Sequence, residues 1–257
     1  MPLQGLYFNY CTLRIDPILY ETMVLATSST KTGFELFMAN IDCKPLVFYA
    51  KHVKNLWISA VDDPDAFERV LSICSGVENL VLIPMRRYIN YPFVPFLERP
   101  SAGSHLRRLT CHLEYLFPPW STMQNFQHAC FANLTHLHLF DEHWSDYAGF
   151  ENLRSLTHLA LACCGPEELA IVIPKLPVLE YVALCSYKYD DFYVPMVNKR
   201  VPVEVHTMYG IRVVWVDGVN RADWERGTTG GADFWDLVER EVTQRRAEMV
   251  CMLCPID

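Results

Sequence analysis

Leu134-Thr-His-Leu-His-Leu139 recurs almost unchanged 22 residues later as Leu156-Thr-His-Leu-Ala-Leu161. Both hexapeptides read Leu-x-x-Leu-x-Leu, and a pattern that returns every 20 to 50 residues or so indicates a stacked repeat architecture. The same apolar spacing occurs in further copies that begin at Val53, Val77, Leu106, Leu179 and Ile211, and more weakly at Tyr20. Adjacent copies start 22 to 33 residues apart. The chain is therefore predicted to be built from repeats.

The spacing within each copy predicts a β-strand with one buried face. The last two apolar residues are two positions apart, so they lie on the same side of a strand, and the residue between them lies on the other side. One strand cannot bury its apolar side alone, but parallel copies that stack side by side form a continuous core. We therefore predict an α/β, leucine-rich-repeat-like solenoid with a parallel concave sheet, outer helices and a C-terminal capping helix.

Length and composition favour a single domain. The chain has 257 residues, of which 51% are hydrophobic, so it can bury a large core. We expect one degenerate solenoid over residues 1–257. Residues 1–50 would form an N-terminal cap and first repeat, residues 51–216 the repeats, and residues 217–257 a C-terminal cap and tail.

Charge and hydropathy exclude several classes of partner. Acidic residues outnumber basic ones by 30 to 22, and no run of Lys or Arg exceeds two residues, which argues against a nucleic-acid surface. No apolar segment has the length of a membrane span, and the first 30 residues lack the pattern of a secretory signal. We expect an intracellular protein, cytoplasmic or nuclear, whose ten cysteines are reduced.

Helices are expected between the strands. Phe34, Phe37, Met38 and Ile41 have helical spacing, and Asp63 can cap a helix that begins at Pro64 and buries Phe67, Val70, Leu71 and Cys74. Another helix should begin at Pro166 and bury Leu169, Val172 and Ile173. Asp233 can cap a final amphipathic helix, whose expected apolar side comprises Phe234, Leu237, Val238 and Val242. This last helix is the predicted C-terminal cap.

Three segments add to the repeats a resemblance to a known family. They are Ile18-Leu-Tyr-Glu-Thr-Met-Val-Leu25, His52-Val-Lys-Asn-Leu-Trp57, and the ending that runs from Asp223-Trp-Glu to Gly230-Gly-Ala-Asp-Phe-Trp235. From about residue 16 onward, the chain resembles the leucine-rich-repeat region of fungal F-box proteins. The resemblance implies a repeat region that holds a target protein and an F-box that docks a Skp-type adaptor of a cullin ubiquitin ligase.

The sequence departs from that family in two respects. No F-box helix of the Leu-Pro-x-Glu type precedes Ile18, so an adaptor and a cullin are expected as partners only if an F-box lies upstream. The repeats also lack the asparagine that usually follows Leu-x-x-Leu-x-Leu. Its positions are occupied by Val61, Met85, Glu114, Glu142, Cys164, Tyr187 and Val219.

Stacked strands would align two columns of residues on the concave face. The first column is Asn55, Asn79, Arg108, His136, His158, Tyr181 and Val213. The second is Trp57, Val81, Thr110, His138, Ala160, Ala183 and Trp215. The aromatic, arginine and histidine side chains have the composition of a contact surface. The predicted protein-binding residues are Asn55, Trp57, Asn79, Arg108, His136, His138, His158, Tyr181 and Trp215. Two alternatives are an inner face that binds nothing, and close contact of Ala160 and Ala183 with a segment of the chain.

Other chemistry has weaker support. His136, His138 and His158, with His112 one strand away, can approach one another, and histidine is a common metal ligand, but the sequence around them offers no recognisable ligand spacing. Cys251-Met-Leu-Cys254 is a single CxxC in the tail, and Cys163-Cys164 is expected to be core and loop. Asp62-Asp63 and Glu167-Glu168 lie where helices should start, which explains their charge.

The most consistent function is therefore protein recognition without catalysis. We expect no catalytic residue, cofactor or metal, and a target protein as the partner. The first alternative is a stand-alone adaptor, or an F-box-less paralogue, with no role in ubiquitin transfer. The second is a hydrolase or another metal-dependent enzyme that uses the histidine columns.

Overall fold

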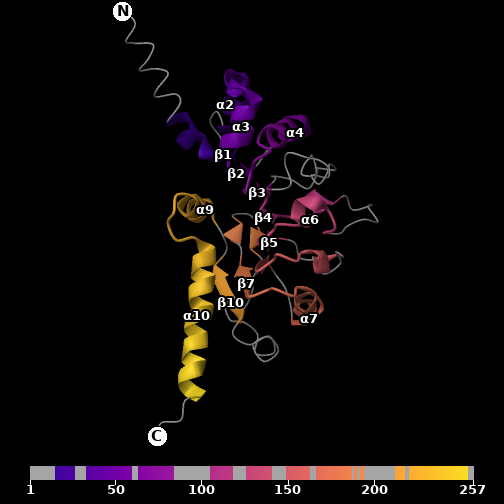
Figure 1. Cartoon of the computed structure of the whole chain (residues 1–257), viewed down its shortest axis with the longest axis vertical. Coiled ribbons are helices and arrows are strands. Elements are labelled where there is room, and N and C mark those ends of the chain that lie inside the picture. Colours follow the sequence, from indigo (N-terminus) through magenta and orange to yellow (C-terminus); the bar gives the residue numbers. More distant parts are fainter. Residues whose placement is uncertain are drawn as a thin grey trace, which may run out of the picture. The chain divides into compact units, whose positions relative to one another are not determined.

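The fold was described from a computed structural model of the whole chain (Figure 1). The structure describes residues 15–26, 33–59, 63–83, 105–117, 126–140, 149–162, 166–186, 188–189, 192–193, 212–217 and 220–253. The chain divides into two compact units. Unit 1 comprises residues 1–123 and 128–133, and unit 2 comprises residues 124–127 and 134–257.

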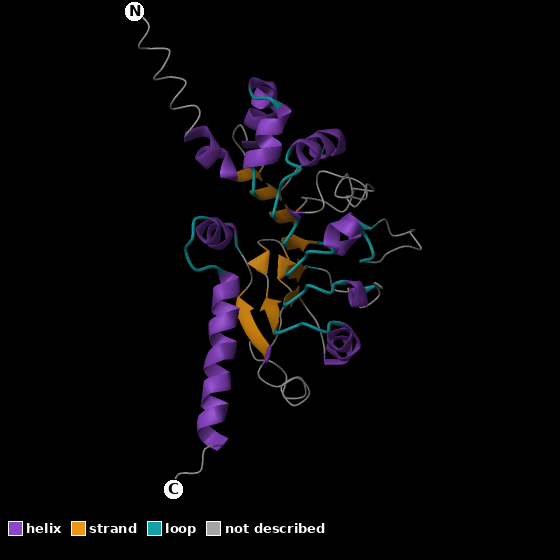
Figure 2. Cartoon of the chain, viewed as in Figure 1, coloured by secondary structure: helices purple, strands orange, loops and turns teal. Residues whose placement is uncertain are grey.

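Unit 1 alternates strands with helices (Figure 2). A helix over residues 15–21 leads into β1 (Thr22–Ala26), α2 (Gly33–Asn40), a 3-10 turn (Ile41–Cys43) and α3 (Leu46–His52). The unit continues with β2 (Asn55–Ser59), α4 (Pro64–Ile73), β3 (Asn79–Ile83), β4 (Arg108–Cys111), α6 (Leu113–Leu116) and a 3-10 turn (Ala129–Phe131). The four strands pair in parallel in the order β1-β2-β3-β4.

Unit 2 carries the other strands of the sheet. These are β5 (His136–Leu139), β6 (His158–Ala162), β7 (Tyr181–Ser186) and β10 (Val213–Asp217), which pair in parallel in that order. Between them lie 3-10 turns at Phe150–Asn152 and Ile173–Lys175, the helix α7 (Pro166–Val172), and a small antiparallel pair, β8 (Lys188–Tyr189) and β9 (Phe192–Tyr193). Two helices, α9 (Arg221–Thr228) and α10 (Phe234–Leu253), end the unit.

Together the strands form an open eight-stranded sheet in the order β1-β2-β3-β4-β5-β6-β7-β10. The predicted α/β class with a parallel sheet is therefore confirmed. The strand order follows the sequence, as it must when each new strand adds to the edge formed by the one before. The assignment of the successive strand-and-helix segments as leucine-rich repeats of a solenoid stays a prediction.

The repeated apolar positions form the core. In the six copies that begin at Val53, Val77, Leu106, Leu134, Leu156 and Leu179, all three apolar positions are buried. Leu134, Leu137 and Leu139 are fully buried, as are Leu156 and Leu159. The strand positions inferred from the spacing are thus confirmed, and each copy contributes one residue before its strand and two residues within it.

The last copy has a different register from the predicted one. The spacing at Ile211 pairs Val214 with Val182, but in the structure Val213 pairs with Val182 and Trp215 with Leu184. The prediction was one residue out of register because Val213-Val-Trp-Val216 has no polar residue to mark a solvent face. A shift of one residue moves every side chain to the other face of a strand. Trp215 therefore lies on the face of Leu184, opposite the predicted concave face.

The helices begin where their capping residues indicate. Asp63 Oδ1 accepts hydrogen bonds from the backbone N–H groups of Asp65 (3.1 Å) and Ala66 (3.2 Å), which starts α4. Phe67, Val70 and Leu71 on that helix are buried, as is Cys74 directly after it, as predicted. Leu169 and Val172 of α7 are buried, whereas Ile173, which begins the 3-10 turn after it, is only partly buried. The sequence interpretation missed α3 and α9.

The predicted final helix is present, but the prediction of its buried apolar side is wrong at one residue. Phe234, Val238 and Val242 are buried as expected, whereas Leu237 is 41% exposed and Trp235 takes its place at 7%. Asp233 starts the helix. Its Oδ1 accepts from the N–H of Trp235 (2.8 Å) and of Asp236 (3.2 Å), while Asp236 Oδ2 accepts from the N–H of Asp233 (2.7 Å). This reciprocal pair is a capping box.

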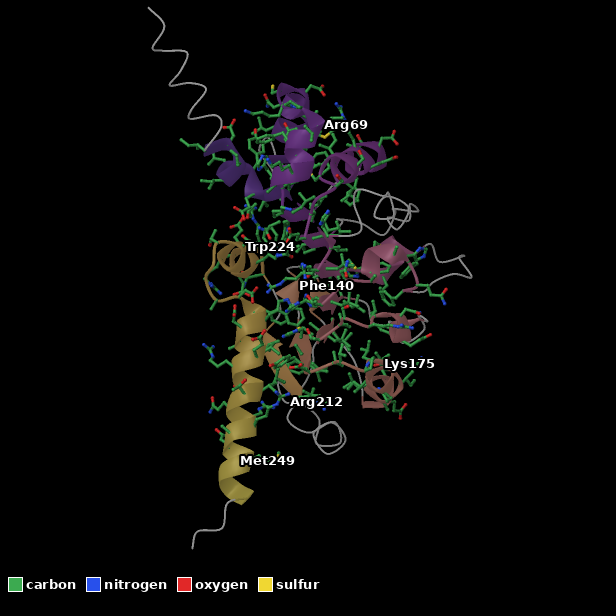
Figure 3. All side chains as sticks on the ribbon, viewed as in Figure 1. Arg69, Phe140, Lys175, Arg212, Trp224 and Met249 are labelled. Atoms are coloured by element: carbon green, nitrogen blue, oxygen red, sulfur yellow. The ribbon has the colours of Figure 1, made fainter. Side chains whose placement is uncertain are left out.

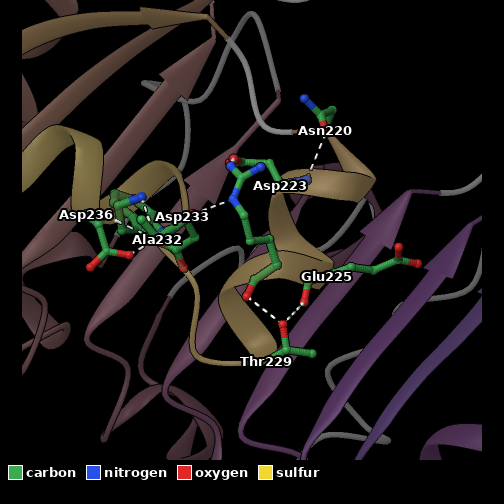
Figure 4. A network of polar contacts seen from close by, with 9 residues as sticks. Asn220, Asp223, Glu225, Thr229, Ala232, Asp233 and Asp236 are labelled. Carbon is green, nitrogen blue, oxygen red and sulfur yellow. Dashed lines mark hydrogen bonds and ion pairs between the residues drawn. The ribbon is translucent and has the colours of Figure 1, made fainter.

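The short link between α9 and α10 is also fixed by polar contacts (Figure 4). Asn220 Oδ1 accepts from the N–H of Asp223 (2.9 Å) and starts α9. Arg226 forms an ion pair with Asp223, and its Nε donates to the carbonyl oxygen of Ala232 (2.7 Å). Because Arg226 connects the end of α9 to the residues before Asp233, the start of α10 is held at a defined place.

Some sequence predictions lie outside the described residues. They concern Asp62, Cys163-Cys164, and the side chains of Cys251 and Cys254.

Candidate functional site

Two Thr-His pairs on adjacent strands of unit 2 form the centre of the candidate site. The parallel register pairs His136 of β5 with His158 of β6, and His158 with Tyr181 of β7. Paired residues on neighbouring strands lie about 4.8 Å apart on the same face. The rings therefore stack. The His136 and His158 centroids are 4.0 Å apart at an interplanar angle of 11°, and those of His158 and Tyr181 are 4.5 Å apart at 16°.

The threonine before each histidine orients the imidazole ring. Thr135 Oγ1 lies 2.8 Å from His136 Nδ1, and Thr157 Oγ1 lies 2.7 Å from His158 Nδ1. The Thr157 hydroxyl uses its one hydrogen to donate to the carbonyl oxygen of Thr135 (3.2 Å), so its oxygen accepts a hydrogen bond from the Nδ1–H of His158. A neutral His158 therefore carries its lone pair on Nε2, whereas a protonated His158 donates from Nε2 to the Glu239 carboxylate.

Helix α10 covers these rings. The Trp235 ring contacts both histidines edge-on, with centroid distances of 5.0 Å to His136 and 5.5 Å to His158. One turn further along the helix, Glu239 Oε1 lies 3.0 Å from His158 Nε2. The acidic group thus faces the ring nitrogen that the threonine leaves available.

The three polar groups converge. One ligand atom from each of His136, His158 and Glu239 lies within 4.8 Å of those from the other two. His158 is 6% exposed, and His136 and Glu239 are partly buried. Two imidazole nitrogens and a carboxylate oxygen are the donor types of many zinc sites, so these residues can hold a metal ion.

An apolar contact holds α10 beside this cluster. Phe234, Trp235, Val238 and Val242 pack with Ala160, Ala183, Cys185, Val214 and Val216 on the sheet. Figure 1 shows α10 alongside β10, with α7 on the other side of the strands. The small side chains of Ala160 and Ala183, both fully buried, allow the helix to approach the strands closely. The alternative that these alanines mark contact with a chain segment is confirmed.

This arrangement corrects the predicted concave surface of unit 2. The helix was expected to close the end of the core, but it lies over the inner face of β6, β7 and β10. The structure brings His136, His158 and Tyr181 together under it. His138 is fully buried and stacks against Phe234, with ring centroids 5.6 Å apart. An open contact surface here was a wrong expectation, because the apolar residues on this face are buried by the chain itself.

In unit 1 the two predicted columns differ in exposure. Asn55, Asn79 and Arg108 are in register on β2, β3 and β4 and are partly exposed. The Asn55 side chain donates to Thr22 Oγ1 (3.1 Å). In the second column, however, Trp57 is only 5% exposed and Val81 is fully buried. The expectation that Trp57 lies open to a partner is therefore wrong.

Glu239 is not among the site residues predicted from the sequence. Its signal is its spacing from Trp235: residues four apart lie on the same side of a helix. Once Trp235 rather than Leu237 is placed in the buried stripe, Glu239 lies at the border of that stripe and can reach the strands. His112, by contrast, belongs to unit 1, where burial lowers its pKa to about 4.

Comparisons with protein-family models and with curated protein sequences give no match to this chain. The resemblance to F-box proteins therefore remains a prediction. Within the described part of the chain, no helix is both long and apolar enough to cross a membrane.

Proposed function

We propose that this protein is a non-enzymatic protein-binding module whose partner docks on the N-terminal helices of unit 1. The observation that carries the proposal is a set of large apolar side chains exposed on neighbouring helices. They are Ile15, Ile18 and Leu19 on the helix over residues 15–21, Leu36 on α2, and Leu46 and Val47 on α3, each exposed by 48% to 72%. Clustered exposed apolar residues are typical of protein interaction sites.

These helices are packed together by aromatic residues on their inner sides. The Tyr20 ring contacts Phe48 (centroids 5.3 Å apart) and Tyr49 (5.7 Å), and Phe37 contacts Tyr49 (5.4 Å). Lys44 forms an ion pair with Asp16. The exposed side chains are therefore presented by ordered elements, which reduces the entropy lost on binding.

The partner that suits this surface is a protein with an apolar contact face. A row of partly exposed polar side chains, Asn55, Asn79 and Arg108, lies on the strands of the same unit and can supply hydrogen bonds. Unit 2 is the weaker candidate, because α10 already covers the apolar part of its inner face.

The resemblance to F-box proteins suggests what the module serves. In that reading the bound protein is the target of a cullin ubiquitin ligase, and a Skp-type adaptor joins the complex. The alternative is a stand-alone adaptor without ubiquitin transfer. The two differ in which proteins accompany the module, so one capture experiment separates them.

The experiment is crosslinking and capture from the native cell extract, followed by mass spectrometry. The wild type is compared with Ile18→Ser/Val47→Ser. The matched control is Glu21→Ser/Lys51→Ser, which changes exposed polar residues on the same helices. We expect the wild type and the control to capture the same proteins, crosslinked to residues 15–52, and the apolar variant to lose them at an unchanged melting temperature.

Each outcome decides a part of the proposal. If the apolar variant captures the same proteins as the wild type, the docking surface is wrong. A second variant, Asn55→Ala/Asn79→Ala/Arg108→Ala, removes the polar row on the strands. If neither this variant nor the apolar variant loses any captured protein, the proposed binding function is wrong. An adaptor and a cullin among the dependent proteins support the ubiquitin-ligase role, and their absence supports the stand-alone adaptor.

A further inference from the structure

We propose that His136, His158 and Glu239 bind one divalent transition-metal ion of the zinc class, and that this ion fastens α10 to the sheet. The three residues come from β5, β6 and α10, and their ligand atoms lie within 4.8 Å of one another. His158 and His136 precede Glu239 by 81 and 103 positions in the sequence, so only the fold brings the three residues together. The inference does not depend on the docking surface of unit 1.

The donor atoms select the class of metal. Imidazole nitrogen and carboxylate oxygen bind Zn²⁺ at about 2.0–2.2 Å, and imidazole also suits Cu²⁺, Ni²⁺ and Fe²⁺. Ca²⁺ and Mg²⁺ prefer six or more oxygen ligands, and this cluster offers a single carboxylate. Two neutral imidazoles and one carboxylate leave a net charge of about +1 with a divalent ion, which the partly exposed setting of Glu239 tolerates.

The threonines supply the outer contacts that such a site needs. Metal-binding histidines usually have their second ring nitrogen hydrogen-bonded, which fixes the tautomer and orients the ring. Here Thr135 Oγ1 contacts His136 Nδ1 at 2.8 Å and Thr157 Oγ1 contacts His158 Nδ1 at 2.7 Å. For both rings this leaves Nε2 as the ligand atom. His158 Nε2 is already directed at Glu239 Oε1, 3.0 Å away.

Metal binding requires one small movement. The two rings are nearly parallel, at 11°, so their Nε2 lone pairs lie in parallel planes and do not meet at one point. His158 is held between His136 and Tyr181, with centroids 4.0 Å and 4.5 Å away. His136 is more exposed than His158, so we expect its ring to tilt towards Glu239 when the ion binds.

The site has an access route and room for an outer ligand. The Glu239 side chain is 47% exposed, whereas that of His158 is 8% exposed, so an ion enters from the Glu239 side. Three protein ligands leave a fourth tetrahedral position, which a water molecule can fill. Because the carboxylate lies on α10 and both imidazoles lie on the sheet, the bound ion links the helix directly to two strands.

The test uses the full chain, stripped with a chelator and then titrated with Co²⁺, whose visible absorption reports coordination by nitrogen and oxygen, and with Zn²⁺ by calorimetry. The variants are Glu239→Gln and His158→Gln. The matched controls are Glu241→Gln, on the same helix and paired with Arg245, and His52→Gln in unit 1. Circular dichroism establishes that each variant is folded.

We expect one ion per wild-type or control chain. Glu239→Gln should weaken the Co²⁺ affinity by at least about tenfold, and Zn²⁺ should raise the melting temperature of the wild type more than that of this variant. The partly exposed Glu239 keeps the test valid even if His158→Gln does not fold. The proposal is overturned if the stripped wild type binds no ion, or if Glu239→Gln binds it as tightly as Glu241→Gln does, since the ion then lies elsewhere.

Discussion

His158 Nε2 lies 3.0 Å from Oε1 of Glu239, across the boundary between β6 and α10. The imidazole is almost fully buried, whereas about half of the carboxylate side chain is exposed. This contact is the polar counterpart of the apolar packing that holds α10 on the sheet. When His158 is protonated, its Nε2–H donates to this carboxylate and adds a directional polar link to that packing.

Removal of this carboxylate should loosen α10. We expect Glu239→Ala to lower the free energy of unfolding by about 1 kcal/mol, less than a fully buried charged hydrogen bond because water screens the exposed half of Glu239. Chemical denaturation at neutral pH in the presence of a chelator measures it. Glu241→Ala on the same helix should change stability by a few tenths of a kcal/mol at most. Equal effects of the two substitutions would contradict the role of Glu239 in holding α10 on the sheet.

The apolar stripe of α10 should be much more sensitive than its outer side. Phe234 is 5% exposed and its ring contacts that of Trp235 at an interplanar angle of 58°, with centroids 4.5 Å apart, so Phe234→Ala should cost about 3–5 kcal/mol. Leu237 is 41% exposed, and Met249, which is labelled on α10 in Figure 3, is 46% exposed. Leu237→Ala and Met249→Ala should therefore each stay within about 0.5 kcal/mol of the wild type in the same denaturation experiment. A large loss from Leu237→Ala would mean that the helix is rotated from its described position.

Gly76 is required by the close approach of the chain to α3. A Cβ atom at this position would lie 1.9 Å from the carbonyl oxygen of Ala50, and a backbone atom cannot move away cheaply. We expect Gly76→Ala to cost about 1–3 kcal/mol through overpacking. Gly33→Ala is the comparison, because its Cβ would lie 3.1 Å from the nearest atom, the carbonyl oxygen of Val24. Thermal melting of both variants should rank Gly76→Ala as the less stable.

Burial should separate two cysteines of unit 1 by reactivity. Desolvation raises the pKa of the buried Cys74 thiol to about 12, so almost none of it is thiolate at neutral pH. Cys43 is exposed. In the native protein, maleimide should modify Cys43 rapidly and Cys74 only after a denaturant is added, as read by peptide mass spectrometry. Rapid native labelling of Cys74 would show that α4 opens readily.

His112 should make unit 1 sensitive to mild acid. Burial lowers its pKa from 6.5 to about 4, so between these values the unfolded chain binds a proton that the folded chain does not. Protonation of His112 therefore does not reduce the free energy of unfolding above pH 6.5, and it reduces that free energy progressively as the pH falls from 6.5 towards 4. We expect His112→Gln to lose less stability than the wild type between pH 7 and pH 5, measured by denaturation at each pH. A parallel decrease for both proteins would contradict the assignment.

The strands could be located from the sequence because their pattern is local. In Leu134-Thr-His-Leu-His-Leu139, one side of the strand is apolar and the other carries threonine and histidine, so period and register are both readable. The caps at Asp63 and Asp233 are equally local, since a side chain bonds backbone groups two or three residues away.

The arrangement of side chains on the inner face of unit 2 could not be read from the sequence, because it depends on contacts between residues that are distant in the chain. Val213-Val-Trp-Val216 is apolar throughout, because α10 buries one face of β10 and the core buries the other, and so its register was open until the partner strand β7 was known. Likewise, the choice between Trp235 and Leu237 for the buried side of α10 follows from the small residues Ala160 and Ala183, more than 50 positions earlier. The positions of β2 to β7 were therefore set by local alternation of side chains, whereas that of β10 was not. The site formed by His136, His158 and Glu239 arose only when packing laid a helix over the histidines.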